Sequence, residues 1–196
     1  SRSVLLLEAG PDYPNFDQLP EDIKFGNNVW LSAYGPHSWD YVAQVTPEQP
    51  NLTIPRGKAT GGSSAINGQV LFRGIPEDYD GWAEMGNDEW SFIKVLPYFN
   101  KLETDLDFSG DFHGSDGPVP VKRYPRSEWL PYANAFEDAC VAVGYEVDED
   151  MNHPESTGVS PRARNTIDGV RMSMALNYLD MARHRLNFNI RGGVTA

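Results

Sequence analysis

The feature that most constrains this sequence is a run rich in glycine and serine between Arg56 and Gly68, which leads into apolar residues 70–72. The paired glycines Gly61 and Gly62 allow the backbone to pass close to a ligand. Three side chains in the run can hydrogen-bond phosphate or ring atoms: Ser63, Ser64 and Asn67. A flexible linker would stay polar at both ends, whereas apolar residues flank this run. The run therefore predicts a segment that lies against a pyrophosphate or a flavin ring.

Two other glycine-containing motifs are excluded by single positions. A Walker phosphate loop requires Ser or Thr directly after Gly-Lys, and Ala59 follows Lys58 here. The nucleophile elbow of hydrolases requires a glycine two residues beyond the serine, and for Ser64 that position is Ile66.

The apolar residues Val4 to Leu7 predict a fully buried parallel strand that ends in an acid, Glu8. In dinucleotide-binding folds, a carboxylate at the end of the second strand accepts hydrogen bonds from both ribose hydroxyls of the adenosine half. The glycine fingerprint of such folds lies about 20 residues upstream of that acid. We therefore expect a further strand and helix to precede residue 1, and a surface acid remains the alternative role for Glu8.

The rest of the sequence predicts a mixture of helices, strands and loops. Residues 11–50 are rich in Pro, Asn and Asp and predict a long loop excursion. Periodic apolar residues predict a helix over residues 92–102, which Pro97 should kink or shorten. Further helices are expected from Pro131 to Gly144, with Phe136, Ala139, Cys140 and Val143 on one face, and from about Met172 to Arg183. Residues 151–169 predict loop or short strands, and residues 188–191 predict a strand.

Composition excludes several classes of partner. The 16 basic and 28 acidic side chains give a net charge of −12, which disfavours binding to nucleic acid or to an anionic membrane. No apolar run approaches the roughly 20 residues of a membrane span. The single cysteine, Cys140, rules out an internal disulfide framework or a cysteine metal cluster, and favours the cytoplasm. We expect Cys140 to be a small buried residue, and we expect no metal site.

Taken in order, several segments resemble the glucose-methanol-choline (GMC) oxidoreductases over nearly the whole chain. The run from Arg56 to Gly74, followed by Asp78-Tyr79-Asp80-Gly81-Trp82, resembles the first signature of this family. The resemblance extends to four more segments: Val4 to Gly10, Trp90 to Phe99, His113 to Pro118, and Ser173 to Leu179. Thr60 and Leu71 depart from the residues usual in the family, which leaves the packing near the cofactor open.

The resemblance implies an FAD site and assigns its residues. Glu8 and Ala9 are expected at the adenosine ribose, and Trp39 in a loop that covers the cofactor, although simple packing is the alternative role for this tryptophan. The resemblance places Gly61, Gly62, Ser63 and Ser64 near the pyrophosphate and flavin, and Asn67, Gly68, Gln69 and Val70 along the isoalloxazine. Some members attach FAD through a histidine where this sequence has Ile66, so the expected binding is non-covalent.

The catalytic base of the family is a histidine near the C-terminal end of the full-length protein, and no histidine here matches its motif. We expect His37, His113, His153 and His184 to be loop or surface residues, so the catalytic residues stay unassigned.

The resulting fold class is α/β (α+β), a partial FAD/NAD(P)-binding Rossmann-like domain with the beginning of a GMC substrate-binding domain. Residues 1–75 are expected to form part of the FAD-binding domain, whose first strand and helix are missing. Residues 76–186 are expected to form the first part of the substrate-binding or cap region, and residues 187–196 a strand returning towards the FAD domain.

The resemblance implies a parent protein that oxidises a small-molecule alcohol by hydride transfer to FAD, as a dehydrogenase or an oxidase. The chain alone is expected to be inactive and to bind FAD weakly or not at all. Two alternatives stay open: an FAD-containing lyase of the same family, and a non-catalytic binding module.

Overall fold

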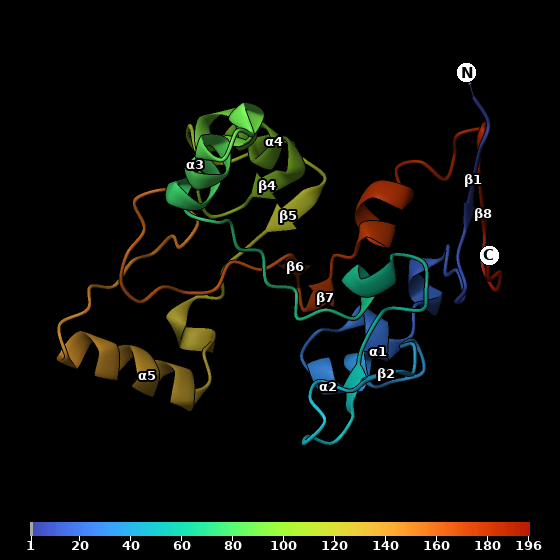
Figure 1. Ribbon diagram of the computed structural model, residues 1–196, viewed down its shortest axis with the longest axis horizontal. Coiled ribbons are helices and arrows are strands. Elements are labelled where there is room, and N and C mark those ends of the chain that lie inside the picture. Colours follow the sequence, from blue (N-terminus) through green and yellow to red (C-terminus); the bar gives the residue numbers. More distant parts are fainter. Residues whose placement is uncertain (1) are drawn as a thin grey trace. The chain divides into compact units, whose positions relative to one another are not determined.

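The computed structural model describes residues 2–196, which form two compact units. Unit 1 contains residues 2–69 and 166–196, and unit 2 contains residues 70–165. Each unit combines helices with small two-stranded sheets (Figure 1). The elements of unit 1 are β1 (Val4–Leu7), a 3-10 turn (Phe16–Gln18), α1 (Glu21–Lys24), α2 (Val29–Ala33), β2 (Tyr41–Ala43), β3 (Leu52–Ile54), a 3-10 turn (Gly62–Ala65), β6 (Thr166–Ile167), β7 (Val170–Arg171), a π-helix (Ala175–Leu179) and β8 (Phe188–Arg191).

The two ends of the described chain meet in unit 1 as a parallel pair, β1 with β8, in the register Val4↔Phe188 to Leu7↔Arg191. Both strands and their type were predicted correctly. The expected full burial of β1 is wrong for this structure, because Val4, Leu5 and Leu7 are each about half exposed. Within residues 2–196, β1 belongs to a two-stranded sheet in which β8 is its single neighbour. The apolar side chains of β1 are therefore not covered on both faces as they would be inside a larger parallel sheet.

The excursion over residues 11–50 is mostly irregular, as predicted, but contains α1, α2 and β2. β2 pairs with β3 in an antiparallel ribbon. Ile23 of α1 is buried with Ala59 and Ile66, and Tyr13 and Leu19 pack against them. This small core joins the excursion to the glycine-rich run, so the excursion positions that run.

The helix expected over residues 172–183 is shorter than predicted. The segment is a π-helix of five residues, Ala175–Leu179, followed by turns. Just before it, the Ser173 N–H donates to the carbonyl of Arg171, so the chain is still turning after β7. Residues 151–169 are loop, apart from the first strand of the β6–β7 hairpin, as expected.

In unit 2, α3 (Pro76–Glu84), a 3-10 turn (Asp88–Trp90) and α4 (Phe92–Leu102) pack through aromatic side chains. Tyr79 lies at the centre and contacts Trp82, Phe92 and Phe99. The Asp78 carboxylate accepts the Ile75 N–H and caps α3. Pro97 does not break α4: it is exposed, so water can solvate the carbonyl that loses its hydrogen bond.

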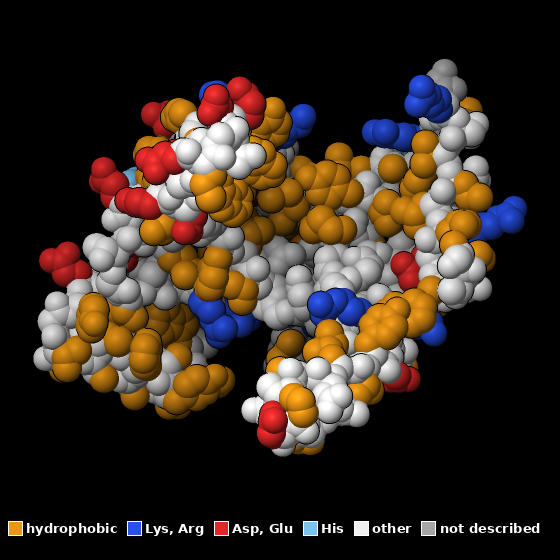
Figure 2. Space-filling view, viewed as in Figure 1, with side chains coloured by type: hydrophobic (Ala, Val, Ile, Leu, Met, Phe, Trp, Pro, Cys, Tyr) orange, Lys and Arg blue, Asp and Glu red, His pale blue; other side chains and the backbone are white. Residues whose placement is uncertain are grey.

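The remainder of unit 2 comprises β4 (Glu103–Asp105) paired with β5 (Val119–Val121), a 3-10 turn (Arg126–Glu128) and α5 (Pro131–Ala142). α5 was predicted correctly, but Phe136 and Val143 of its expected apolar face are exposed and Cys140 is half-buried. Figure 2 shows apolar side chains gathered over this helix. None of the helices in residues 2–196 combines the length and the apolar character that a membrane crossing requires.

Candidate cofactor site

The glycine-rich run forms a tight turn in unit 1 whose shape depends on glycine. Gly61 and Gly62 have φ values of 99° and 57°, in the left-handed region that glycine adopts readily. A Cβ atom at Gly57 would lie 2.0 Å from the carbonyl oxygen of Gly62, so the two strands of the turn touch through their backbones.

One side of this turn is open. A Cβ atom at Gly62 or at Gly68 would meet no protein atom within 4 Å. Ser63, Asn67 and Gly68 are exposed, whereas Ala65 and Ile66 between them are buried. The backbone is therefore not covered by other protein atoms on the side from which a flat ligand could approach.

The two serines of the turn differ in what they can offer. The Ser63 hydroxyl oxygen accepts the Gly57 N–H at 3.1 Å, which leaves its own hydrogen available. The Ser64 hydroxyl donates to the Gly61 carbonyl at 2.6 Å and accepts the Met174 N–H at 2.9 Å. Ser63 can therefore donate to a ligand, whereas Ser64 holds the turn.

The residues expected along the isoalloxazine also have different environments. Asn67 is exposed, and its Oδ1 accepts the Gln69 N–H at 3.0 Å, so its amide nitrogen is directed elsewhere. Gln69 is 1 % exposed, has a φ of 58°, and its side-chain oxygen accepts the Thr166 hydroxyl at 2.8 Å. Val70 is exposed and begins unit 2. The Gln69 side chain is a structural member of unit 1.

The end of β1 lies against the same turn. A Cβ atom at Gly10 would lie 1.8 Å from the Lys58 carbonyl oxygen, and the Thr60 N–H donates to the Pro11 carbonyl at 3.0 Å. Glu8 and Ala9 are half-buried just before this contact. Glu8 Oε1 accepts the Gly10 N–H at 2.8 Å, and within residues 2–196 its second oxygen has no hydrogen-bond donor. Glu8 thus offers a carboxylate oxygen beside the glycine turn.

Trp39 also lies next to the run, because its N–H donates to the Arg56 carbonyl at 2.8 Å. Its ring stacks on Tyr41 at 5.4 Å, and the Lys58 ammonium lies 4.5 Å from its centroid. The ring is thus already engaged within the β2–β3 part of unit 1.

Three charged residues near this site were not predicted from the sequence. Arg171 is fully buried and donates hydrogen bonds to the carbonyl oxygens of Ala65 and Asn67. Asp12 and Arg183 form a two-hydrogen-bond ion pair, at 2.6 and 2.8 Å, beside a cavity of about 40 Å³. The hydrogen bonds from Arg183 hold the pKa of Asp12 below its usual value. No local sequence pattern identifies these residues, because their partners are more than 100 positions away.

His37 is buried rather than on the surface. Its Nδ1 lies 2.7 Å from Asp22 Oδ2, and its Nε2 lies 2.7 Å from the Tyr13 hydroxyl. Burial and the nearby Asp22 carboxylate raise the pKa of Tyr13. Because the His37 carbonyl accepts the Lys58 N–H at 2.7 Å, this chain of hydrogen bonds fixes the excursion against the glycine run.

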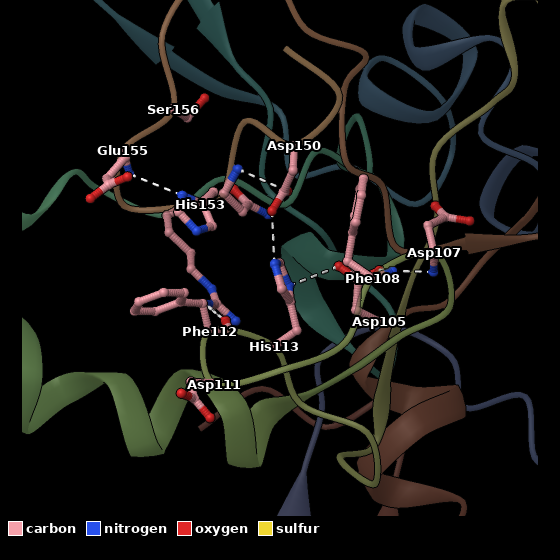
Figure 3. A network of polar contacts seen from close by, with 12 residues as sticks. Asp105, Asp107, Phe108, Asp111, Phe112, His113, Asp150, His153, Glu155 and Ser156 are labelled. Atoms are coloured by element: carbon pink, nitrogen blue, oxygen red, sulfur yellow. Dashed lines mark hydrogen bonds and ion pairs between the residues drawn. The ribbon is translucent and has the colours of Figure 1, made fainter.

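His113 is buried as well, in a network of charged side chains in unit 2. Figure 3 shows it between Asp105 and Asp150, with Nε2 2.8 Å from Asp150 Oδ2 and Nδ1 3.2 Å from Asp105 Oδ2. The carboxylate of Asp105, then those of Asp150 and Glu103, raise the pKa of His113 to about 11. Burial alone would raise the pKa of Asp105, but hydrogen bonds from His113 and its other donors lower it to about 2.

The carboxylates of this network are held by arginines. Arg123 donates to both Asp105 oxygens at 2.9 and 3.0 Å, and Arg73 donates to Glu103 at 2.6 Å. Glu103, Asp105 and His113 have ligand atoms within 4.8 Å of one another, a spacing that could suit a metal. Arg73, Arg123 and the protonated His113 place three positive charges among the three buried carboxylates, and the more exposed Asp107 lies 3.6 Å from Arg123, so we interpret the network as a structural ion cluster.

The residues of unit 1 fit part of an FAD molecule. The bare backbone at Gly62 and Gly68 leaves room for a ring or a pyrophosphate, the Ser63 hydroxyl can donate, and Glu8 can accept from ribose hydroxyls. Ile66, where a covalent link would form in some relatives, is 4 % exposed and carries no nucleophile.

Comparisons with known proteins identify the family of the chain. The sequence model described as GMC oxidoreductase matches residues 26–196. An uncharacterized GMC-type oxidoreductase of Rhodococcus erythropolis is 36 % identical over 194 residues, which are 99 % of this chain and 38 % of that protein. An oxygen-dependent choline dehydrogenase of Pseudomonas aeruginosa is 41 % identical over 196 residues, covering 96 % of this chain and 34 % of that protein.

Solved structures give the same result. Pyridoxine 4-oxidase from Mesorbium loti superposes with a TM-score of 0.86 at 30 % identity, covering 97 % of this chain and 37 % of that one. Formate oxidase of Aspergillus oryzae, studied for modification of its FAD, superposes with a TM-score of 0.80 at 25 % identity, covering 98 % and 34 %. The chain spans about a third of the length of these relatives, and the predicted α/β fold class is confirmed. This chain belongs to the GMC oxidoreductase family.

Proposed function

We propose that the protein containing this chain oxidises a small-molecule alcohol, a CH–OH donor, and that unit 1 supplies part of its non-covalent FAD site. The observation that carries this proposal is the open glycine turn, with no protein atom within 4 Å of a Cβ at Gly62 or Gly68, beside the free carboxylate oxygen of Glu8. Bound FAD would accept the hydride, and the protein residues would bind and orient it.

Different residues of unit 1 would bind different parts of FAD. Glu8, next to Ala9, would accept hydrogen bonds from the adenosine ribose. Gly61 and Gly62 would allow close approach, and the Ser63 hydroxyl would donate to a phosphate oxygen. Ser64 would act by holding the turn, since both its hydrogen-bonding directions are used internally.

The flavin ring would lie along the exposed residues that follow. Asn67 and Gly68 would face it, Gln69 would contribute through its backbone because its side chain is buried, and Val70 would provide an apolar contact. Trp39 would cover the cofactor from the β2–β3 side. With Ile66 at the position of the covalent link, FAD would be held non-covalently.

The base that takes the alcohol proton is proposed to lie outside these residues. His37 and His113 are each held by carboxylates, and His153 accepts the Glu155 N–H at 3.2 Å.

We further propose the domain division predicted from the sequence. Residues 1–75 would belong to the FAD-binding domain, residues 76–186 to the substrate-binding region, and residues 187–196 to a returning strand. We also propose that the protein is cytoplasmic.

The test is to express the full-length protein and examine its flavin. We expect an absorbance band of flavin that survives desalting and bleaches under anaerobic conditions with at least one alcohol of a broad panel. The isolated chain of 196 residues should retain little or no flavin after the same desalting. A full-length protein without flavin would contradict the proposal, and bound flavin that no alcohol bleaches would favour a family member whose FAD is not redox-active.

A further inference from the structure

Arg171 differs from the other buried arginines because it has no carboxylate partner. It is 0 % exposed, and five neutral oxygens accept its hydrogen bonds. Within residues 2–196, Arg73, Arg123 and Arg183 each form an ion pair, whereas no carboxylate lies within ion-pair distance of Arg171. Burial lowers the pKa of Arg171 to about 10, so it stays protonated at neutral pH. A full positive charge is thus kept inside unit 1 by hydrogen bonds to neutral oxygens, with the Asp22 carboxylate stabilising it from beyond ion-pair distance.

The acceptors come from two segments that Arg171 holds together. In the excursion, it donates to the carbonyls of Asp22 and Ile23, at 3.2 and 2.8 Å, and to the Ser32 hydroxyl at 2.8 Å. In the glycine-rich run, it donates to the carbonyls of Ala65 at 2.7 Å and Asn67 at 3.1 Å. The carbonyls of residues 65 and 67 therefore point into the unit, towards the guanidinium.

The orientation of the Asn67 carbonyl fixes the direction of the next N–H. The described residues contain no cis peptide bond, and in a trans peptide the C=O and N–H point in opposite directions. The Gly68 N–H must then point away from Arg171, towards the exposed side. Gly68 is exposed with open space beside it, and its N–H has no acceptor within residues 2–196. The Ile66 N–H, by contrast, already donates to the Ser63 carbonyl at 3.3 Å.

We propose that Arg171 is a positioning residue that aims the Gly68 N–H at an electron-rich edge of the bound flavin ring. This inference rests on the proposed FAD site. By donating to the Asn67 carbonyl, the buried cation orients the 67–68 peptide and polarises it, which makes its N–H a stronger donor. The N–H donor, with the positive charge of Arg171 behind its peptide, would stabilise the negative charge that the ring gains on reduction, so it would raise the reduction potential of the flavin.

The test compares Arg171→Lys and Arg171→Met with Arg123→Lys in the full-length protein. Lysine keeps the charge but concentrates its donors on one atom, and methionine removes both charge and donors. Arg123→Lys is the matched control, because Arg123 is a buried arginine of unit 2 whose side chain is 5 % exposed. The readouts are the dissociation constant of FAD, the flavin absorbance spectrum and the flavin midpoint potential.

We expect Arg171→Met to weaken FAD binding by about tenfold, as for the loss of one charged hydrogen bond, and to shift the midpoint potential to more negative values. Arg171→Lys should lie between wild type and Arg171→Met. Arg123→Lys should lower stability but leave the affinity, spectrum and potential of the flavin unchanged. Arg171 variants that fold and match Arg123→Lys in all three flavin readouts would overturn the proposal.

A measurement on the wild-type protein covers the case in which both Arg171 variants fail to fold. Hydrogen–deuterium exchange at Gly68 should slow when FAD is added, because the N–H gains an acceptor. Unchanged exchange at Gly68 with FAD bound would overturn the role of Arg171 while leaving the FAD site intact. A wild-type protein that binds no FAD would instead refute the proposed function itself.

Discussion

At the scale of single residues, this chain places its charges in two different kinds of interior. Arg171 lies among neutral carbonyls, whereas His113 lies among carboxylates that keep it protonated. An uncompensated charge left in such an interior destabilises the fold strongly. The charge of each residue should therefore have a measurable effect on the stability of the fold.

His113 should make the stability of unit 2 depend on pH. Its pKa is about 11 in the folded protein and about 6.5 when unfolded. The folded state therefore binds more protons between these values, so its contribution is complete below pH 6.5 and is lost as the pH rises towards 11. His113→Gln should lower the free energy of unfolding by about 3 kcal/mol at pH 7, because one buried carboxylate loses its counter-charge.

Urea unfolding of wild type and His113→Gln at pH 7 and at pH 10 checks this prediction. The difference between the two proteins should shrink at the higher pH, since only the wild type loses the His113 contribution. A difference of equal size at both pH values would show that the imidazole charge is not the cause.

The residues also show where prediction from sequence ends. The close backbone approach within the glycine run could be predicted, because closely spaced residues carry the pattern, whereas the cofactor roles of this run and of Glu8 stay predictions. The inward direction of Gln69, the internal bonds of Ser64 and the buried positions of Arg171 and His113 could not, because each depends on a partner distant in the sequence.

At the scale of elements, the periodicity of apolar residues predicted the positions of those strands and helices that depend on local packing. The strands at residues 4–7 and 188–191 and the helices α4 and α5 appear where the apolar pattern places them. Pro97 was overestimated as a helix breaker, because an exposed carbonyl tolerates the loss of a hydrogen bond. The segment after β7 was overestimated as a helix, because the turn at Ser173 delays its start.

The glycine turn provides a test at this scale. Gly57→Ala should destabilise the protein by about 1–3 kcal/mol and weaken FAD binding, because the added Cβ would lie 2.0 Å from the Gly62 carbonyl oxygen. Gly81→Ala, within α3, is the control: nothing lies within 4 Å of its Cβ, so helix propensity should stabilise the protein by about 0.5–1 kcal/mol. Thermal unfolding and FAD titration of both variants measure this; an equally stable Gly57→Ala protein would contradict the tight turn.

At the scale of the whole molecule, large apolar side chains are exposed in both units. Tyr132, Phe136 and Val143 of the α5 region are 66–75 % exposed, and Leu5 of β1 is 53 % exposed. We expect the isolated chain to enhance the fluorescence of the dye ANS more strongly, per mole, than the full-length protein does. Equal enhancement by the two proteins would show that these surfaces stay uncovered in the longer protein.

The pairing of β1 with β8 has a consequence for biosynthesis. Val4 cannot meet Phe188 until the ribosome has added more than 180 further residues. At about 5–20 residues per second, the apolar strand waits on the order of ten seconds or more without its neighbour. The time at which β8 leaves the exit tunnel therefore sets the earliest time at which β1 and β8 can pair.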